Sequence, residues 1–275
     1  MLQSLYSRLS QYDVSEARSI VRLLLMDTFG LTLTDICGGA LNNLTDAEQM
    51  HLERLMVRLE GGEPVQYVTG KAFFFNREFF VRPGCLIPRP ETEELCQWII
   101  TEAGNAHDIL DIGTGSGCIA ITLKSCLPDA DITAWDISHE ALEIAQENAK
   151  FNCTDVRFTI QDTLSPPEDI DRWDIIVSNP PYICQKEAEN MERNVLDHEP
   201  QQALFVPDND PLLFYNSIIR YAVKALKPNG KLFFEINPIY AQEIKDAMEE
   251  HGFNEVSIRK DMNDKKRMVK GRIQK

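Results

Sequence analysis

The tetrapeptide Asn179-Pro180-Pro181-Tyr182 is the segment whose residue types point most directly to chemistry, and it follows the mainly apolar run 174–178. The carboxamide oxygen of Asn179 and the backbone carbonyl of Pro180 can each accept an N–H from a planar amino group, which counters lone-pair delocalisation as positive charge develops. The prolines fix φ and add no N–H donors, while Tyr182 offers a flat face. A bare Asn-Pro pair would indicate a turn that closes a strand. The full tetrapeptide instead predicts methyl transfer onto nitrogen.

A second segment with chemical meaning is the glycine-rich loop Asp111-Ile-Gly-Thr-Gly-Ser-Gly117, which follows a strand-like run and opens a helical pattern. Glycines at these positions permit a tight turn and a close approach of the backbone to a ligand. Because the G-x-G-x-G spacing differs from the dinucleotide pattern G-x-G-x-x-G, the loop alone does not require a pyrophosphate site.

Two acidic residues end the next two strand-like runs. Asp136 lies 23 residues beyond Gly113, where a carboxylate can bind both hydroxyls of a ribose. Asp162 ends the third run, where a carboxylate could accept the amino group of an adenine. Singly, each acid could cap a helix or lie in a solvated turn. Together with the glycine loop at the end of the first strand, however, these two strand ends indicate a nucleoside pocket. The predicted cofactor-binding residues are Asp111, Gly113, Thr114, Gly115, Gly117, Asp136, Ile137, Asp162, Thr163 and Asn179.

The choice of cofactor follows from the residues after the fourth strand. NAD and S-adenosylmethionine both fit a glycine loop with a ribose-binding acid, but an enzyme that transfers hydride has no use for the segment 179–182. We therefore predict S-adenosylmethionine, with S-adenosylhomocysteine as the product. Its sulfonium methyl needs only an in-line nitrogen about 3 Å away, so no metal is expected. Asp111 is suited to hold the methionine ammonium group, directly or through water.

The elements that must position these residues alternate between strand and helix patterns. This alternation predicts an α/β fold with a doubly wound, mostly parallel, Rossmann-like sheet, whose ligands lie at the carboxyl ends of its strands. The polar stretch 183–210 has no periodicity, which is typical of a functional lid or a disordered loop. Strands are predicted at 109–112, 132–135, 156–160, 175–177 and 232–236, helices at 116–126, 138–150, 212–226 and 240–251, and a final hairpin from 255–260 and 267–272.

The part of the chain before this region has a different sequence pattern. Apolar residues repeat at helical spacing behind two possible capping boxes, Asp13 with Glu16 and Thr45 with Glu48, which predicts a small helical bundle. Residues 64–90 are rich in aromatic and β-branched types, including Tyr67-Val-Thr-Gly70, and predict a linking β-hairpin. The expected domains are a helical bundle at 1–63, a hairpin linker at 64–90 and a methyltransferase domain at 91–275.

Charge and composition narrow the function further. The 275 residues carry a net charge of −15, and residues 93–258 hold 11 basic and 30 acidic side chains. An acidic body repels phosphate backbones, so we expect no nucleic acid partner. The 43% hydrophobic content supports a sizeable core, and neither a signal peptide nor a membrane span is visible, so a cytoplasmic monomer is expected. The seven scattered cysteines are predicted to be free thiols.

Two further motifs give the chain a close resemblance to a known family. With Gly62-Glu-Pro-Val-Gln-Tyr-Val-Thr-Gly70 and Leu86-Ile-Pro-Arg-Pro-Glu-Thr-Glu93, the chain resembles the bacterial release-factor glutamine methyltransferases of the HemK/PrmC type over nearly its whole length. The resemblance implies methylation of the glutamine side-chain amide in the Gly-Gly-Gln loop of peptide-chain release factors, and a helical N-terminal domain that helps to bind this protein substrate. The substrate-binding residues it implies are Asn179, Pro180, Pro181, Tyr182, Arg89, Glu91 and Thr92, of which Asn179, Pro180 and Tyr182 are assigned to catalysis.

The sequence departs from the family pattern at a position that matters for the cofactor. Relatives often carry an aromatic residue after Asp162, whereas this chain has Thr163 and Leu164, so Leu164 is expected to pack against the adenine. Two alternative functions stay open: an adenine amino methyltransferase that acts on DNA or RNA by gripping a flipped base, and a non-catalytic protein that binds S-adenosylmethionine.

Overall fold

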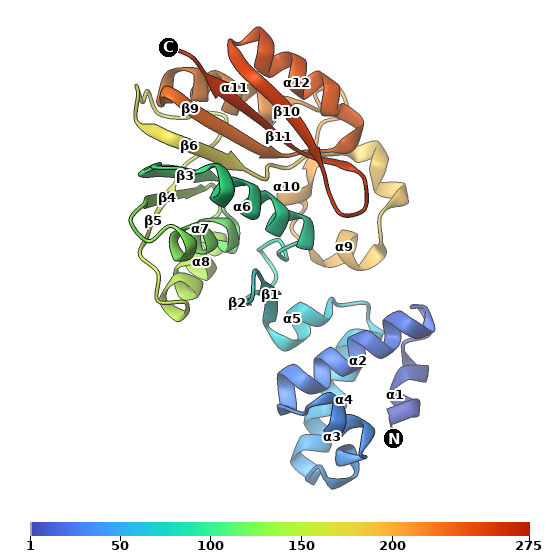
Figure 1. Ribbon diagram of the computed structural model, residues 1–275. Coiled ribbons are helices and arrows are strands. Elements are labelled where there is room, and N and C mark those ends of the chain that lie inside the picture. The colour runs from blue at the N-terminus through green and yellow to red at the C-terminus, as the bar shows by residue number, and fades with distance from the viewer. Residues whose placement is uncertain (1) are drawn as a thin grey trace. The chain divides into compact units, whose positions relative to one another are not determined.

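The computed structural model describes residues 2–275 and divides the chain into two compact units (Figure 1). The first unit comprises the residues up to 71 together with the short stretches 81–83 and 191–198. The second unit comprises residues 72–80, 84–190 and 199–275. Both units therefore contain segments that are distant in sequence. The domain boundaries expected after residues 63 and 90 stay predictions.

The first unit is a helical bundle whose caps follow the sequence signals. The side chain of Asp13 accepts the backbone N–H groups of Ser15 and Glu16, and Thr45 and Glu48 form a reciprocal capping box. The apolar faces of these helices pack into one buried cluster that includes Leu24, Leu25 and Met56. The elements are α1 (Leu2–Arg8), α2 (Val14–Phe29), α3 (Leu33–Cys37), η1 (Ala40–Asn43), α4 (Asp46–Glu60), α5 (Val65–Thr69) and α9 (Arg193–His198).

The expected hairpin is shorter than predicted, because its first part is helical. Tyr67 to Gly70 was assigned to a strand pattern, but these residues form most of α5 and its C-cap, where Gly70 has a φ of 75°. Burial of Val65, Tyr67 and Val68 on this short helix outweighs their preference for strands. The hairpin itself consists of β1 (Lys71–Phe74) and β2 (Arg77–Phe80), joined by two residues with positive φ, as a tight hairpin turn requires.

The second unit is built on a seven-stranded sheet in the order β10-β11-β9-β6-β3-β4-β5. The five strands from β9 to β5 pair in parallel, whereas β11 pairs antiparallel with both β9 and β10. The predicted mostly parallel sheet and the final hairpin are confirmed. The strands are β3 (Asp108–Ile112), β4 (Asp131–Asp136), β5 (Val156–Ile160), β6 (Trp173–Ser178), β9 (Leu226–Glu235), β10 (Phe253–Lys260) and β11 (Lys266–Ile273).

The order of the strands reverses beside β3. After β3 the chain moves outward through β4 and β5, and it then returns to the other side of β3 to form β6. Parallel α/β sheets bind ligands at such a switch point, outside the carboxyl ends of the strands. The buried hydroxyl of Ser178 at the end of β6 donates to the carbonyl of Ile112 at the end of β3, at 2.6 Å. The glycine loop and the segment 179–182 therefore leave the sheet side by side.

Helices cover both faces of the sheet. Buried side chains of α6, α7 and α8 form one apolar cluster with the strands, and those of α11 and α12 form another (Figure 1). Helix α6 was not predicted, although Pro90 occupies its first turn, where proline's missing N–H has no helical partner to lose. The helices are α6 (Pro90–Glu102), α7 (Cys118–Cys126), α8 (His139–Phe151), α11 (Leu213–Ala225) and α12 (Ala241–Glu250), with the 3-10 helix η3 at Pro238–Tyr240.

The stretch 183–210 does not form the structureless loop that its composition suggested. It contains several short elements, and two of its strands pair in parallel as a separate small sheet. Sequence periodicity could not reveal elements of two to six residues, because each is shorter than the window needed to detect a period. The elements are β7 (Ile183–Cys184), η2 (Gln185–Asn190), α9, α10 (Gln201–Leu204) and β8 (Phe205–Val206).

No disulfide joins any of the seven cysteines, all of which lie within the described residues, and Cys85, Cys96, Cys118 and Cys184 are buried. Within residues 2–275, no helix combines the length and the apolar character that crossing a membrane would require.

Asn148 on α8 gives a direct test of how the hairpin is attached to the sheet unit. Its fully buried carboxamide donates to the carbonyls of Phe80 (2.9 Å) and Ser116 (3.0 Å) and accepts the N–H of Phe80 at 2.6 Å. Asn148→Ala should lower the free energy of unfolding by about 2–4 kcal/mol, because it leaves buried backbone groups unpaired. Urea denaturation measures the loss. The control Asn152→Ala removes side-chain bonds to the carbonyls of Glu78 and Asn148 from a half-buried site, and an equal loss there would contradict the assigned role.

Candidate active site

A pocket lies at the carboxyl ends of β3, β4 and β6, within the second unit. Its walls come from the glycine loop, the residues after β4 and β6, the segment 84–89 and the start of α10. The structure thus brings together most of the residues selected from sequence. The predicted residues that line the pocket are Arg89, Thr92, Gly113, Thr114, Gly115, Asp136, Ile137, Thr163, Asn179, Pro180 and Pro181.

Five predicted residues lie behind or beside the pocket wall. Gly117 has a φ of 81°, and a Cβ there would lie 3.0 Å from Ile121 Cδ1 and 3.1 Å from Ala145 Cβ. This glycine therefore serves the close packing of α7 against α8. The predicted residues outside the lining are Asp111, Gly117, Glu91, Asp162 and Tyr182.

Asp111 forms part of the buried floor beneath the glycine loop. Its Oδ2 accepts the hydroxyl of Thr114 at 2.6 Å, while its Oδ1 has no hydrogen-bond partner among the described residues. Burial raises the pKa of Asp111 to about 7, although the bond from Thr114 opposes this shift. A buried carboxylate oxygen without a donor marks a place where a cationic or N–H group of a ligand, or a water bridging to one, would be stabilised.

Asp136 links the end of β4 to the glycine loop. Its two oxygens accept the N–H groups of Gly115 (2.8 Å) and Ser138 (2.9 Å). Burial raises the pKa of Asp136, and these backbone donors act against the rise. Because each carboxylate oxygen has a second lone pair, the side chain can still accept hydroxyl groups from the pocket.

The residues after β5 lie differently from the expectation. Asp162 Oδ1 accepts the N–H of Leu164 at 2.8 Å, which closes a local turn. Leu164 is exposed and lines a different cavity, and its expected packing against the adenine stays a prediction. The aromatic side chain in the pocket is Phe214 of α11, a helix tied to this region by the bond from Ser217 Oγ to the carbonyl of Thr163. Sequence spacing could not identify Phe214, because it comes from a helix far along the chain.

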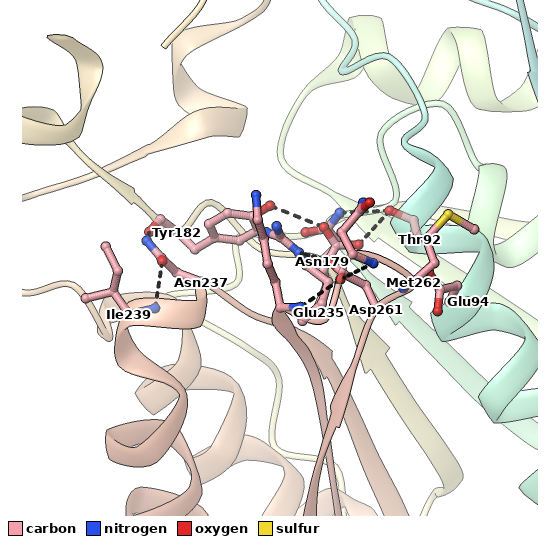
Figure 2. Close-up of polar contacts among 12 residues, drawn as sticks. Thr92, Glu94, Asn179, Tyr182, Glu235, Asn237, Ile239, Asp261 and Met262 are labelled. Carbon is pink, nitrogen blue, oxygen red and sulfur yellow. Dashed lines mark hydrogen bonds and ion pairs between the residues drawn. The ribbon is translucent and has the colours of Figure 1, made fainter. Parts of the chain in front are cut away.

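The end of β6 is connected to a buried polar network (Figure 2). Asn179 Nδ2 lies 3.4 Å from Thr92 Oγ1, whose hydroxyl donates to Glu235 Oε2 at 2.6 Å. The hydroxyl of Tyr182 donates to the other oxygen, Glu235 Oε1, at 3.2 Å. Burial raises the pKa of Tyr182, so its hydroxyl is protonated and acts as a donor. The side chain of Asn237 donates to the carbonyl of Tyr182 at 3.2 Å, which fixes the exit of this loop.

An ion pair holds one wall of the pocket. Glu199 is almost fully buried and accepts both the guanidinium of Arg89 at 2.6 Å and the N–H of Ile87 at 3.1 Å. Glu199 stands directly before Pro200, which lines the pocket with Gln202 and Ala203. The pair therefore attaches this wall to the segment 84–89. No sequence pattern indicates Glu199, because it lies in an acidic stretch without periodicity.

The pocket contains no group of candidate metal ligands among the residues that the structure describes. One such group, His107, Asp108 and Asp131, lies at the amino-terminal ends of β3 and β4, on the opposite edge of the sheet. The ammonium of Lys227 already contacts Asp108 there, at 2.6 Å.

The sheet order, the glycine loop and the acid at the end of β4 define a Rossmann-like methyltransferase of the S-adenosylmethionine-dependent class. Two family models agree: a methyltransferase small domain matches residues 92–204, and a PrmC N-terminal domain matches residues 1–70. A crystal structure of a methyltransferase from Pyrococcus furiosus shares the fold, with a TM-score of 0.52 and 16% identity over 84% of this chain and all of that one.

Curated relatives identify the family within this class. A release factor glutamine methyltransferase of Bacteroides thetaiotaomicron is 46% identical over 94% of this chain and 93% of its own length. A protein of the same name from Flavobacterium psychrophilum is 40% identical over 95% of this chain and 93% of its own length. The chain belongs to the release factor glutamine methyltransferase family. The resemblance inferred from its motifs is confirmed.

The shifted pKa of Asp111 predicts a pH-dependent stability. An unfolded aspartate has a pKa near 3.9, so the folded protein binds this proton more tightly, and the contribution of Asp111 to stability falls as pH rises from about 4 to about 7. Asp111→Asn removes this ionisation. When the pH rises from 5 to 8, the unfolding free energy of wild type should fall by on the order of 2–3 kcal/mol relative to that of the variant. Urea unfolding at both pH values tests this, and parallel curves for the two proteins would rule it out.

Proposed function

We propose that this enzyme transfers a methyl group from S-adenosylmethionine to the side-chain amide nitrogen of the glutamine in the Gly-Gly-Gln loop of peptide-chain release factors. One observation carries the proposal: Asn179 and Pro180, which can grip a planar amino group, line the same pocket as the glycine loop and Asp136. The names of the curated relatives support the same substrate. Membership of the family disfavours the two alternatives, a nucleic acid methyltransferase and a non-catalytic protein.

The residues of the pocket fit S-adenosylmethionine, which would supply an electrophilic sulfonium methyl. Asp136 would accept the ribose hydroxyls, and Ile137 and Phe214 would provide apolar surface for the adenine. The unpartnered Oδ1 of Asp111 and the hydroxyl of Thr114 would stabilise the methionine ammonium group, directly or through water. Gly113 and Gly115 allow the backbone to approach the ligand closely. Asp162 and Gly117 would act by shaping these loops.

The amide grip explains how a weak nucleophile could react. The Oδ1 of Asn179 and the carbonyl of Pro180 would each accept one N–H of the glutamine amide, and both bonds strengthen as the nitrogen gains positive charge. The bound cofactor would supply the methyl group to the lone pair of this nitrogen, with its sulfur as the leaving group, and the methylated amide would release one N–H proton to solvent. The proposed chemistry requires no metal. The Tyr182 ring, anchored at its hydroxyl by Glu235, would support the loop that presents these acceptors.

The proposal also covers the protein substrate, the oligomeric state and the cellular location of the enzyme. We propose that the helical first unit helps to bind the release factor, that the enzyme acts as a cytoplasmic monomer, and that Arg89, Glu91 and Thr92 shape the side on which the substrate enters. Nucleic acid is disfavoured because residues 93–258 hold 11 basic and 30 acidic side chains, a balance that repels phosphate backbones.

A methyl-transfer assay tests the function directly. Labelled S-adenosylmethionine is supplied with a purified bacterial release factor, with the same factor carrying glutamine-to-alanine in its Gly-Gly-Gln loop, and with DNA. Label on the intact factor alone is the expected result. Label on DNA would establish the nucleic acid alternative, and no label on any of the three, with S-adenosylmethionine bound, would establish the non-catalytic one.

Asn179→Ala separates catalysis from cofactor binding. The variant should reduce kcat by about 100-fold or more, by analogy with the loss of one oxyanion-type hydrogen bond. Its dissociation constant for S-adenosylmethionine, measured by calorimetry, should stay nearly unchanged. Asp136→Ala is the matched comparison, since it should weaken cofactor binding by removing the acceptor for the ribose. Equal losses of binding in both variants would refute the separate roles.

A glutamate in place of the target glutamine tests the grip from the substrate side. The two acceptors would then face carboxylate oxygens without donors, so methylation should fall below detection while the release factor still competes as an inhibitor. Mass spectrometry of the modified peptide measures the product. Methylation of the glutamate form would contradict the amide-grip mechanism.

A further inference from the structure

The buried carboxyl group of Glu235, at the end of β9, lies next to the proposed amide grip and has no assigned role in the reaction. Only 1% of this residue is exposed. Its two oxygens accept the hydroxyls of Thr92, at 2.6 Å, and Tyr182, at 3.2 Å. Burying a carboxylate is costly even when it is hydrogen-bonded, so its presence here in place of an apolar side chain points to a task in the site.

We propose that Glu235 and Thr92 are positioning residues that fix which end of the Asn179 carboxamide faces the substrate. This inference rests on the proposed function, because it explains how Asn179 presents an acceptor to the glutamine amide. The three side chains come from three different elements, the end of β9, helix α6 and the loop after β6, and hydrogen bonds connect them (Figure 2). Thr92 and Asn179 also line the pocket.

The direction of the hydrogen bonds carries the argument. An ionised carboxylate offers only acceptors, so the single proton of the Thr92 hydroxyl is committed to Glu235. The oxygen of Thr92 can then act only as an acceptor toward its other neighbour. That neighbour is Nδ2 of Asn179, at 3.4 Å. The nitrogen of the carboxamide is therefore turned toward Thr92.

The orientation of this carboxamide decides what the pocket can bind. The oxygen and nitrogen of an asparagine side chain have nearly the same size, so only hydrogen-bond partners distinguish the two orientations. With Nδ2 directed at Thr92, Oδ1 of Asn179 has no partner among residues 2–275 and is available to accept an N–H from the substrate. The opposite orientation would place an NH₂ group against the NH₂ of the target amide, two donors facing each other.

A cation near Glu235 favours the charged form that this arrangement needs. Burial raises the pKa of Glu235, whereas the bond from Thr92, the charge of Arg267 and the bond from Tyr182 act in the opposite direction. The guanidinium of Arg267 contacts the buried carboxylate of Asp261 at 3.3 Å. Asp261 also accepts two backbone N–H groups of the turn between β10 and β11, so this turn holds the cation in place.

The 3.4 Å contact between Asn179 Nδ2 and Thr92 Oγ1 is long for a hydrogen bond. It contributes more by orienting the carboxamide of Asn179 than by the strength of the bond. Bonds among catalytic groups are often long before the substrate binds and shorten in the complex. An acceptor that is already oriented avoids a rearrangement during the reaction, which is how preorganised dipoles lower a barrier. The expected consequence of disturbing the chain is a lower kcat with unchanged cofactor binding.

A pair of threonine variants isolates the hydroxyl. Thr92→Val keeps the shape of the side chain but removes the hydroxyl, and it should lower kcat with the release factor by about tenfold or more. Thr92→Ser restores the hydroxyl and should recover kcat to within about threefold of wild type. Binding of S-adenosylmethionine should stay the same in both. The control is Thr122→Val, the same change at a buried threonine whose hydroxyl has no partner, and it should leave kcat unaltered.

Glu235→Gln tests the requirement for a charge. A glutamine has an NH₂ group that can donate to Thr92, which allows the hydroxyl of Thr92 to turn toward Asn179 and the carboxamide to rotate. We expect kcat to fall by about tenfold or more, as in Thr92→Val, with cofactor affinity unchanged. Full activity in Glu235→Gln and in Thr92→Val would overturn the proposal.

A readout that does not depend on activity separates this inference from the proposed function. In ¹⁵N-labelled enzyme, the side-chain NH₂ signals of Asn179 can be assigned by their loss in Asn179→Ala. We expect these signals to shift in Thr92→Val and Glu235→Gln and to stay in place in Thr122→Val. Unshifted signals in the first two variants would refute the positioning role. If wild type fails to methylate a release factor, the proposed function fails, and the amide signals still decide the orientation of Asn179.

Discussion

The reversal of strand order between β3 and β6 is the constraint on which the rest of the site depends. It places the carboxyl ends of two parallel strands next to each other, and the bond from Ser178 to the carbonyl of Ile112 joins them there. The glycine loop and the segment 179–182 both start from this point. A shift in the register between these strands would separate the proposed cofactor site from the proposed amide grip, because each loop is only a few residues long.

Buried acidic groups surround this point, each with a different set of partners. Asp111 has a hydroxyl donor on one oxygen and none on the other, Asp136 has backbone donors, and Glu235 has two hydroxyl donors and a nearby cation. Glu199 is paired with Arg89. Burial raises the pKa of the first three groups, so the fold disfavours their charged forms, and the hydrogen bonds to them act against this effect.

Local elements hold these groups and their partners in place. The αL glycines let the loop after β3 bend under Asp136, and the turn between β10 and β11 brings Arg267 toward Glu235. Helix α6 carries Thr92 to the same place, starting at a proline that suits its first turn. The proposed chemistry at Asn179 thus depends on segments that begin almost ninety residues before it and end almost ninety after it, which is how a compact sheet domain builds a site from distant parts of a chain.

The sequence by itself determined the features that short-range patterns encode. Strands β3 to β6 and the final hairpin followed from period and turn signals, and the family from motifs at 62–70, 86–93 and 179–182. Tertiary structure alone decided the placement of Phe214, the pairing of Arg89 with Glu199, and the contacts of Glu235 with Thr92 and Tyr182. It also placed Tyr67–Thr69 in a helix and gave the stretch 183–210 its short elements. The reason is physical: these outcomes rest on burial and hydrogen bonds between residues far apart in sequence, and such contacts leave no local period to detect.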